Sequence, residues 1–372
     1  MTGDNMELEA RCRTTAMGIM PHLDIDKALE LASTLDIPFW PQLPKVSFYE
    51  DMYVQASENF PGMVVDSDNK KLSLDTARFQ KELSTYSEMM REQKTFTLSR
   101  NYSVVYHRFL EKDLQGYHAI RGQMIGPVSF GFKITDENNR PIIYDDGLRT
   151  LLFDFLQRKV NVQYQELMQK NSNAFVWLDE PGLGWVFSGL SGYNDIQTRE
   201  EYQYFLSGME GPKAIHLCAN VNLPYLLNLG VEILSFDSYQ IEVMPKGYAN
   251  AVAEFIEAGG IISWGIVPND SRNLEKESPE TLADLLSSYW EVVSNNTTVS
   301  TKQIAEQALI APARCCLKDI GKVGAPGEST DGKMAKKKQL ANIEERLVEK
   351  AFDLLPQVSQ LIRNKFGLEP LH

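Results

Sequence analysis

Short apolar runs alternate with longer amphipathic stretches along most of this chain, and the alternation predicts its secondary structure. In the longer stretches apolar residues recur at i, i+3, i+4 and i+7, which is typical of helices that bury one face. The helical stretches are residues 24–35, 145–170, 222–230, 246–259 and 278–293. The apolar runs of strand length are residues 14–20, 37–40, 122–130, 174–180, 214–218, 232–237, 260–267 and 308–315.

Eight strands that are mostly separated by helices predict a parallel sheet, and eight strand–helix repeats predict an α/β fold of the closed (β/α)8 TIM-barrel type. A doubly wound open sheet is the alternative. That fold usually carries a glycine-rich nucleotide loop after an early strand, and neither G-x-G-x-x-G nor G-x-x-x-x-G-K-[ST] occurs in the sequence. We therefore expect residues 1–372 to form a single barrel domain.

Two segments interrupt the repeat. Residues 45–120 are too long for one crossover and contain two helical patterns, at 75–93 and 102–117, so we expect a helical insertion after the second strand, over one end of the barrel. Residues 321–334 (GKVGAPGESTDGKM) are rich in glycine and small polar residues. They predict a flexible loop before a closing helix at about residues 336–365.

Composition narrows the class of protein. A hydrophobic content of 43% and a charged content of 23% are ordinary for a globular protein, and no apolar run reaches the length of a membrane span. The polar N-terminus lacks the apolar core of a signal peptide, so we expect a cytoplasmic protein. A formal net charge of −13 argues against a nucleic-acid partner. Four cysteines, two of them adjacent, do not make a disulfide framework.

A histidine and a cysteine stand two residues apart in the run AIHLC. Because alternate residues of a strand face the same side, His216 and Cys218 project together at the carboxyl end of the predicted fifth strand, where such barrels keep their active sites. Imidazole and thiolate are good zinc ligands, but a zinc site needs three or four donors. Taken alone, such a pair is more often a hydrogen-bonded core histidine beside an inert buried cysteine.

Two further strand ends supply more donors. Cys315 stands where the eighth strand ends, and Asp237 stands at the end of the sixth. Their side chains converge with those of His216 and Cys218 if the barrel closes. This set of nitrogen, sulfur and oxygen donors favours a metal site over a structural role for the histidine.

Other strand ends carry polar or permissive residues. Asp179 and Glu180 end the fourth strand, where they could serve as general acid or base, hold a substrate ammonium, or cap the next segment. Gly18 ends the first strand and would let a ligand approach the backbone closely, and His22 follows it in a loop, with or without a role.

With these residues in place, the sequence resembles the catalytic C-terminal barrel of the cobalamin-independent methionine synthases. That family lies within a wider group that contains uroporphyrinogen decarboxylase and the zinc-dependent corrinoid methyltransferases. The resemblance covers most of the chain. It depends on TTAMGIMP at the start, GPVS at 126–129, LDEPGLG at 178–184, HLC at 216–218, FDS at 236–238 and Cys315-Cys316-Leu317, where Cys316 replaces the expected glycine.

The resemblance implies a zinc-activated thiolate that attacks a methyl group to form a thioether. Zinc would be held by His216, Cys218 and Cys315, with Asp237 in the place of a family glutamate. If the thiol is homocysteine, Asp179, with Glu180 beside it, would hold the substrate ammonium.

The backbone of Gly18, Ile19 and Met20 would hold the carboxylate of the same substrate. The loop GIVPND (265–270) has no histidine to act as acid toward a folate. The methyl donor expected from this difference is therefore a methylcorrinoid, free or on a partner protein, rather than methyl-folate.

Three other functions remain open at this stage. One is a catabolic methyltransferase that moves a methyl group from a small methylated compound to a corrinoid protein. A second is a decarboxylase like uroporphyrinogen decarboxylase, but the first-strand loop, GIMPHLD, offers none of the arginines that would bind porphyrin carboxylates. The third is a barrel with a purely structural zinc.

Overall fold

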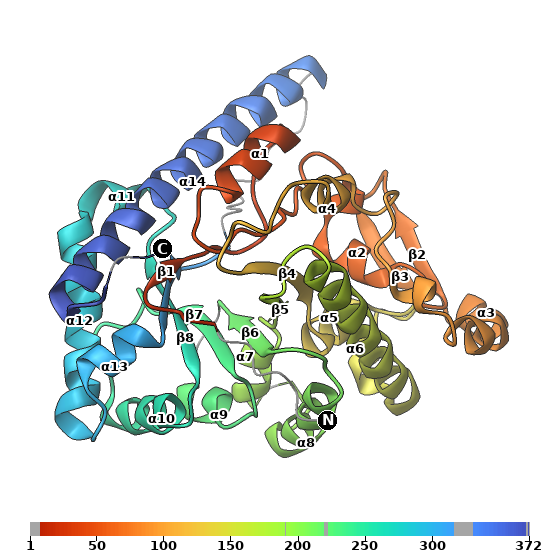
Figure 1. The fold of residues 1–372 in the computed structure, drawn as a ribbon. Coiled ribbons are helices and arrows are strands. Elements are labelled where there is room, and N and C mark those ends of the chain that lie inside the picture. The colour runs from red at the N-terminus through yellow and green to blue at the C-terminus, as the bar shows by residue number, and fades with distance from the viewer. Residues whose placement is uncertain (1–7, 190, 219–221, 316–329, 370, 372) are drawn as a thin grey trace.

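The computed structural model describes residues 8–189, 191–218, 222–315, 330–369 and 371. Its centre is a curled sheet of seven parallel strands in the order β1-β9-β8-β7-β6-β5-β4 (Figure 1). The strands of this sheet are β1 (Arg13–Thr14), β4 (Ile120–Ile125), β5 (Ala174–Asp179), β6 (Lys213–Leu217), β7 (Ile233–Asp237), β8 (Ile261–Val267) and β9 (Ala308–Pro312). Five of the eight predicted strands, those observed as β5 to β9, thus lie within three residues of the expected bounds.

Helices connect the strands and cover the outer face of the sheet (Figure 1). Their bounds are α1 (Ile25–Ala32), α2 (Met52–Ser57), α3 (Thr76–Met89), α4 (Val104–Leu110), α5 (Pro127–Lys133), α6 (Asp146–Met168), α7 (Leu183–Phe187), α8 (Asp195–Ser207), α9 (Leu223–Leu227), α10 (Lys246–Glu257), α11 (Ser271–Lys276), α12 (Pro279–Asn296), α13 (Thr301–Glu306) and α14 (Thr330–Phe366). Short 3-10 turns lie at Phe48–Glu50, Gln93–Phe96 and Ile142–Tyr144. Each predicted helix is present, and the first begins at the cap Asp24, whose side chain accepts from two backbone amides.

The sheet is barrel-like, but it is not the regular closed eight-stranded barrel that the sequence predicted. Residues 37–42 lie between the two edges as isolated bridges, Ile19 to Gln42 on one side and Phe39 to Arg121 on the other. Pro38 and Pro41 explain the difference, since proline has no N–H to donate to a ladder.

The predicted strand 122–130 also differs from the structure. β4 ends at Ile125, and α5 begins at Pro127, which occupies the first turn of that helix. Proline is favoured at this position because its φ is already helical and its missing N–H would have no helical partner. The segment GPVS is therefore a strand-to-helix turn rather than a strand end.

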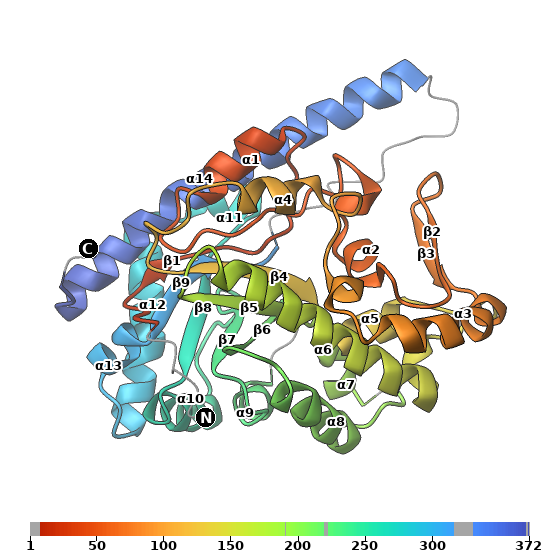
Figure 2. The ribbon, with the colours of Figure 1, turned by 45° about the vertical axis from the view of Figure 1, so that its right-hand side comes forward.

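Residues 45–120, expected to be a helical insertion, hold α2, α3 and α4 and also an antiparallel hairpin of β2 (Met63–Asp66) and β3 (Lys71–Leu74). Figure 2 shows the hairpin and α3 at the side of the molecule far from α12 and α13. Aromatic rings attach this region to α6, because Phe60 and Phe96 lie 5.2 and 5.6 Å from the ring of Phe155. The insertion thus shares the core of the helical layer.

The closing helix is longer than predicted. α14 begins at Thr330, so residues 330–334 of the expected loop are helical, and residues 321–329 lie outside the described part of the chain. α1 and α14 lie side by side in both views (Figures 1 and 2), joined by an ion pair of 2.6 Å between Lys27 and Glu349. No helix in the described ranges combines the length and the apolar character needed to cross a bilayer.

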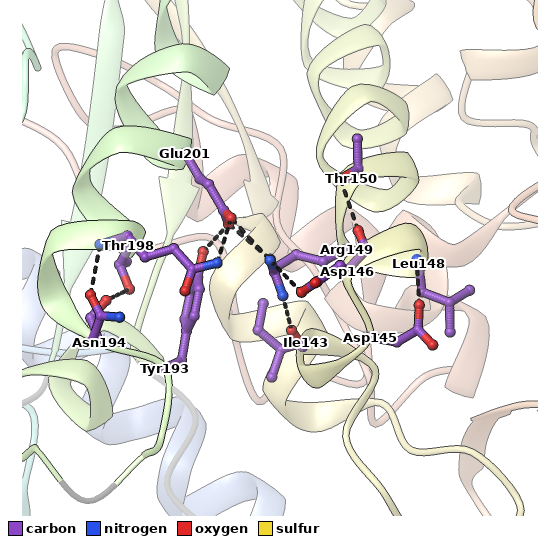
Figure 3. Close-up of polar contacts among 11 residues, drawn as sticks. Ile143, Asp145, Asp146, Leu148, Arg149, Thr150, Tyr193, Asn194, Thr198 and Glu201 are labelled. Atoms are coloured by element: carbon purple, nitrogen blue, oxygen red, sulfur yellow. Dashed lines mark hydrogen bonds and ion pairs between the residues drawn. The ribbon is translucent and has the colours of Figure 1, made fainter.

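A buried ion pair joins α6 to α8 close to the segment that follows β5 (Figure 3). Arg149 is only 7% exposed, and its guanidinium contacts both carboxylate oxygens of Glu201, at 2.8 and 3.0 Å. The same guanidinium donates to the carbonyl of Ile143 at 2.8 Å, and the hydroxyl of Tyr193 donates to Glu201. This two-point geometry fixes the orientation of both helices.

We expect Arg149→Met to lower the free energy of unfolding by about 2 kcal/mol, because it leaves a partly buried carboxylate without its cation. Chemical denaturation of the variant against the parent measures the loss. Arg78→Met is the control, since it breaks an exposed helical pair with Glu82 and should cost under about 0.5 kcal/mol. Equal losses for the two variants would contradict the assigned role.

Candidate metal centre

Three strand ends of the sheet bring four metal-ligating side chains to one place. Asp179 on β5 is directly opposite His216 on β6, so both side chains occupy the same level of the sheet. Cys218 comes one residue after β6 ends and faces the same way as His216. Cys315 comes three residues after the end of β9. Because the strands are parallel, all four residues lie at one edge.

The ligating atoms of Asp179, His216, Cys218 and Cys315 all lie within 4.8 Å of one another. The Sγ of Cys315 lies 3.7 Å from Oδ2 of Asp179. Asp179 and His216 are buried, and the two cysteines are half-buried. One carboxylate oxygen, one imidazole nitrogen and two sulfurs at these separations are the donor set and the spacing of a tetrahedral zinc site.

His216 is held in an orientation that suits metal binding. Its Nδ1 lies 3.0 Å from the hydroxyl oxygen of Ser235 on β7. Its Nε2 is buried and has no hydrogen-bond partner among the described residues. A second hydrogen-bonded group behind a ligating imidazole is the usual way in which proteins fix its tautomer and orientation.

The surroundings of the four residues shift two pKa values in opposite directions. The pKa of the Cys218 thiol is lowered, chiefly by hydrogen bonding with Cys315 and also by the neighbouring His216. Burial raises the pKa of the Asp179 carboxyl to about 7, against the opposing effect of His216. Oδ1 of Asp179 has no partner among the residues described. The site therefore favours thiolate and holds a carboxylate oxygen available to a ligand.

Asp237, the fourth donor expected from the sequence, lies outside this group of four. Its Oδ2 accepts from Nε of Arg314 at 2.5 Å, and its Oδ1 accepts from the backbone N–H of Gln240 at 3.2 Å. Since Arg314 is adjacent to Cys315, the ion pair fixes the end of β9 against β7. Asp179 takes the place in the group that we had expected for Asp237.

Glu180, an expected substrate-binding residue, faces α5 instead of the four donors. Its carboxylate accepts from the backbone N–H groups of Val128 and Ser129, at 3.2 and 2.8 Å, and from the hydroxyl of Ser129 at 2.6 Å. Burial raises the pKa of Glu180 to about 7, while these hydrogen bonds oppose that rise. In this arrangement Glu180 joins the end of β5 to the first turn of α5.

The segment Gly18 to Met20, expected to hold a carboxylate, is paired with the chain at Gln42. The N–H of Met20 donates to the carbonyl of Gln42 at 3.0 Å, and the N–H of Gln42 donates to the carbonyl of Gly18 at 2.7 Å. A Cβ at Gly18 would lie 2.3 Å from the side chain of Gln123, so glycine is needed here for packing. Ile19 is half-buried, and the buried His22 lies outside the group of four.

Sequence reasoning missed the polar residues that lie behind the four donors. Ser235 stands two residues before Asp237, on the same face of β7. Arg121 lies in β4 and immediately precedes the predicted strand 122–130. A charged residue inside a run of strand residues is the signal that could have been noticed. Ser235 could not have been identified in this way, because its hydrogen bond to His216 is known only from the fold.

No protein-family model and no curated protein match this sequence. Among solved structures, it is similar to a B12-independent methionine synthase from Shewanella sp. W3-18-1 in complex with selenomethionine, at 12% identity and a TM-score of 0.41, over 68% of this chain and 64% of that chain. It is also similar to a candidate vitamin-B12-independent methionine synthase from Listeria monocytogenes, at 12% identity and a TM-score of 0.40, over 67% of this chain and 69% of that chain. These likenesses are too distant to carry an argument about this chain.

We expect Gly126→Ala to destabilise the link between β5 and α5. The backbone φ of −81° at Gly126 suits any residue, but a Cβ there would lie 2.1 Å from Oε1 of Glu180. Displacing that carboxylate should cost about 2 kcal/mol of unfolding free energy, measured by chemical denaturation. Gly147→Ala is the control, because its nearest neighbour would lie at 3.5 Å. A loss at position 147 as large as that at 126 would argue against the clash.

Proposed function

We propose that this protein is a zinc-dependent methyltransferase that transfers a methyl group to a thiol, with homocysteine as the acceptor and methionine as the product. The observation that carries the proposal is the convergence of the donor atoms of Asp179, His216, Cys218 and Cys315 within 4.8 Å of one another. The motifs that resemble the methionine synthase family supply the reaction class.

The residues fit zinc. Nε2 of His216 is buried without a partner among the described residues, which is costly unless a ligand satisfies it. Two sulfurs, one nitrogen and one oxygen are zinc donors rather than the all-oxygen set that calcium or magnesium prefers. Bound there, zinc would supply Lewis acidity that lowers the pKa of a substrate thiol.

The protein residues position the reactants. The substrate thiol releases its proton to water, and its sulfur attacks the methyl carbon. The bond between that carbon and the donor breaks, its electron pair stays on the donor, and a thioether forms. Ser235 holds His216 in place, and Oδ1 of Asp179, which has no partner in the described part of the chain, can accept a hydrogen bond from the substrate ammonium.

A methylcorrinoid is the donor that we propose. Transfer from a methyl-folate requires protonation of the leaving amine, and the loop 265–270 contains no histidine to supply the proton. A cobalt-bound methyl group needs no such acid. Glu180 is not an alternative acid in this arrangement, since its carboxylate binds the first turn of α5.

Metal analysis of the parent and of three variants tests the centre, and Asp179→Asn and Asp237→Asn form a matched pair. The purified protein should contain about one zinc per chain. Asp179→Asn and Cys218→Ser should weaken zinc binding by about 10-fold or more, because each removes an anionic donor. Asp237→Asn should leave zinc binding within about 2-fold of the parent, because Asp237 binds Arg314 instead. The measurement is competition with a chromogenic chelator.

The two Asp→Asn variants decide whether Asp179 or Asp237 is the fourth donor. A large loss in Asp237→Asn with none in Asp179→Asn would restore the donor set expected from the sequence. Zinc binding that is equal in all three variants and the parent would place the metal elsewhere and overturn the proposed centre.

Methionine formation tests the donor. With homocysteine as acceptor, methylcobalamin should support turnover and methyltetrahydrofolate should not, as measured by the appearance of methionine. The chelator-treated protein should be inactive with either donor, and added zinc should restore its activity. Turnover with the folate alone would contradict the donor assignment. A zinc-containing protein inactive with both would favour the catabolic corrinoid methyltransferase, whereas a protein that binds no zinc and forms no methionine would favour a decarboxylase.

A further inference from the structure

A fully buried arginine lies inside the curled sheet, below the four donors. Arg121 is in the second position of β4 and has no exposed surface. Its side chain shares the inner face of the sheet with Phe39 of the facing segment and Trp177 of β5. Barrel interiors of this class are normally filled by Val, Ile and Leu, so a guanidinium at this position needs a physical explanation.

Neutral groups surround the guanidinium on most sides. Its carbon lies 4.6 Å from the ring centroid of Phe39 and 4.4 Å from that of Trp177, which places the cation between two aromatic rings. Nε donates to the hydroxyl of Thr15 at 3.0 Å, and Nη1 donates to the side-chain oxygen of Gln123 at 2.8 Å and to the carbonyl of Gly122 at 3.3 Å. These contacts fix its position but do not neutralise its charge.

The anions that act on this cation belong to the candidate metal centre. Burial lowers the pKa of Arg121, and Asp179 and Cys315 are the groups that oppose this lowering. Nη2 of Arg121 and Oδ1 of Asp179 are both buried and both lack a hydrogen-bond partner among the described residues. A buried charge without a compensating charge is strongly unfavourable, and arginine does not lose its proton. On the paired strands β4 and β5, Arg121 is opposite Phe175 and Asp179 is opposite Ile125, so the alternation of side chains places Arg121 and Asp179 on the same inner face of the sheet. This shared face favours a single electrostatic unit.

We propose that Arg121 is the buried counter-charge of the candidate metal centre, and that it stabilises the carboxylate of Asp179 before any cation binds. Arg121 acts from below the donors and is not a ligand, so it is a positioning residue. The inference deepens the proposed function, because it concerns the same four residues, but its first test requires no metal.

The charge balance gives this arrangement a definite consequence. With Asp179 ionised and both cysteines as thiolates, the donor set carries three negative charges, which one divalent cation and Arg121 together neutralise. Since Arg121 repels an entering cation as well as stabilising the anions, its removal should weaken the metal-free protein more than the metal-bound one. A side chain that only filled the core would weaken both equally.

Lys159 on α6 provides a matched buried cation for comparison. It is only 3% exposed and donates to the carbonyl of Glu58 at 3.2 Å. Its electrostatic partners are Glu58 and Glu166, and neither belongs to the metal centre. Its removal should therefore destabilise the protein without any coupling to Asp179.

The test is a double-mutant cycle on the full chain, with chelator present and at about pH 8.5, where Asp179 is ionised. The variants are Arg121→Gln, Asp179→Asn and the two combined, and the measurement is the melting temperature. We expect the loss caused by Arg121→Gln to be at least about halved when Asp179 is Asn. The control cycle of Lys159→Met with Asp179→Asn should be additive.

An additive result for Arg121→Gln and Asp179→Asn would overturn the proposal, whatever metal the protein binds. If Arg121→Gln alone fails to fold, folding of the combined variant supports the counter-charge. If the combined variant also fails, Arg121→Lys, which keeps the charge, decides by its own cycle: a loss that Asp179→Asn leaves unchanged overturns the proposal.

A second measurement separates this inference from the proposed function. Zinc should raise the melting temperature of the parent, and it should raise that of Arg121→Gln by more, because a repelling charge has been removed. An equal or smaller rise in Arg121→Gln would argue for a scaffolding role and against the counter-charge. No rise in the parent would overturn the zinc centre and leave the metal-free cycle to decide on Arg121.

Discussion

The parallel direction of the strands is the constraint on which the rest of this structure depends. It brings the ends of β5, β6 and β9 to one edge of the sheet, where Asp179, His216, Cys218 and Cys315 meet within 4.8 Å. Because side chains alternate along each strand, the residue two positions before a donor also points into the interior of the sheet. The site is therefore a property of the sheet as a whole and of no single loop.

Polar groups behind the donors distinguish this interior from an aliphatic one. Ser235 orients His216, and Arg121 lies between two aromatic rings with one nitrogen unused. Outside the sheet, Glu180 and the ion pair of Arg149 with Glu201 attach the segments that follow β5 to their helices. The strand end that carries Asp179 is thus fixed on both sides, by charge within the sheet and by hydrogen bonds outside it.

Most strand positions could be predicted from the sequence, and so could the grouping of His216, Cys218 and Cys315, because all three stand at or just past strand ends. Their binding of a metal stays a prediction. The irregular segment 37–42 could not be predicted, since the effect of two prolines on a ladder depends on which strands flank them. The fourth donor was also beyond reach. Asp179 and Asp237 both end strands, and only the position of Arg314 in space decides which carboxylate is already paired.

The order of the elements along the chain has a consequence for biosynthesis. β9 pairs with β1 on one side and with β8 on the other, so the last strand joins the first to the rest of the sheet. Cys315 and Asp179 are separated by 136 positions in the chain. During translation, β1 can therefore pair with β9 only after most of the polypeptide has been made. Contacts between residues so distant in sequence form slowly. A nascent chain that stalls before β9 would therefore present the thiol of Cys218 without its sulfur neighbour.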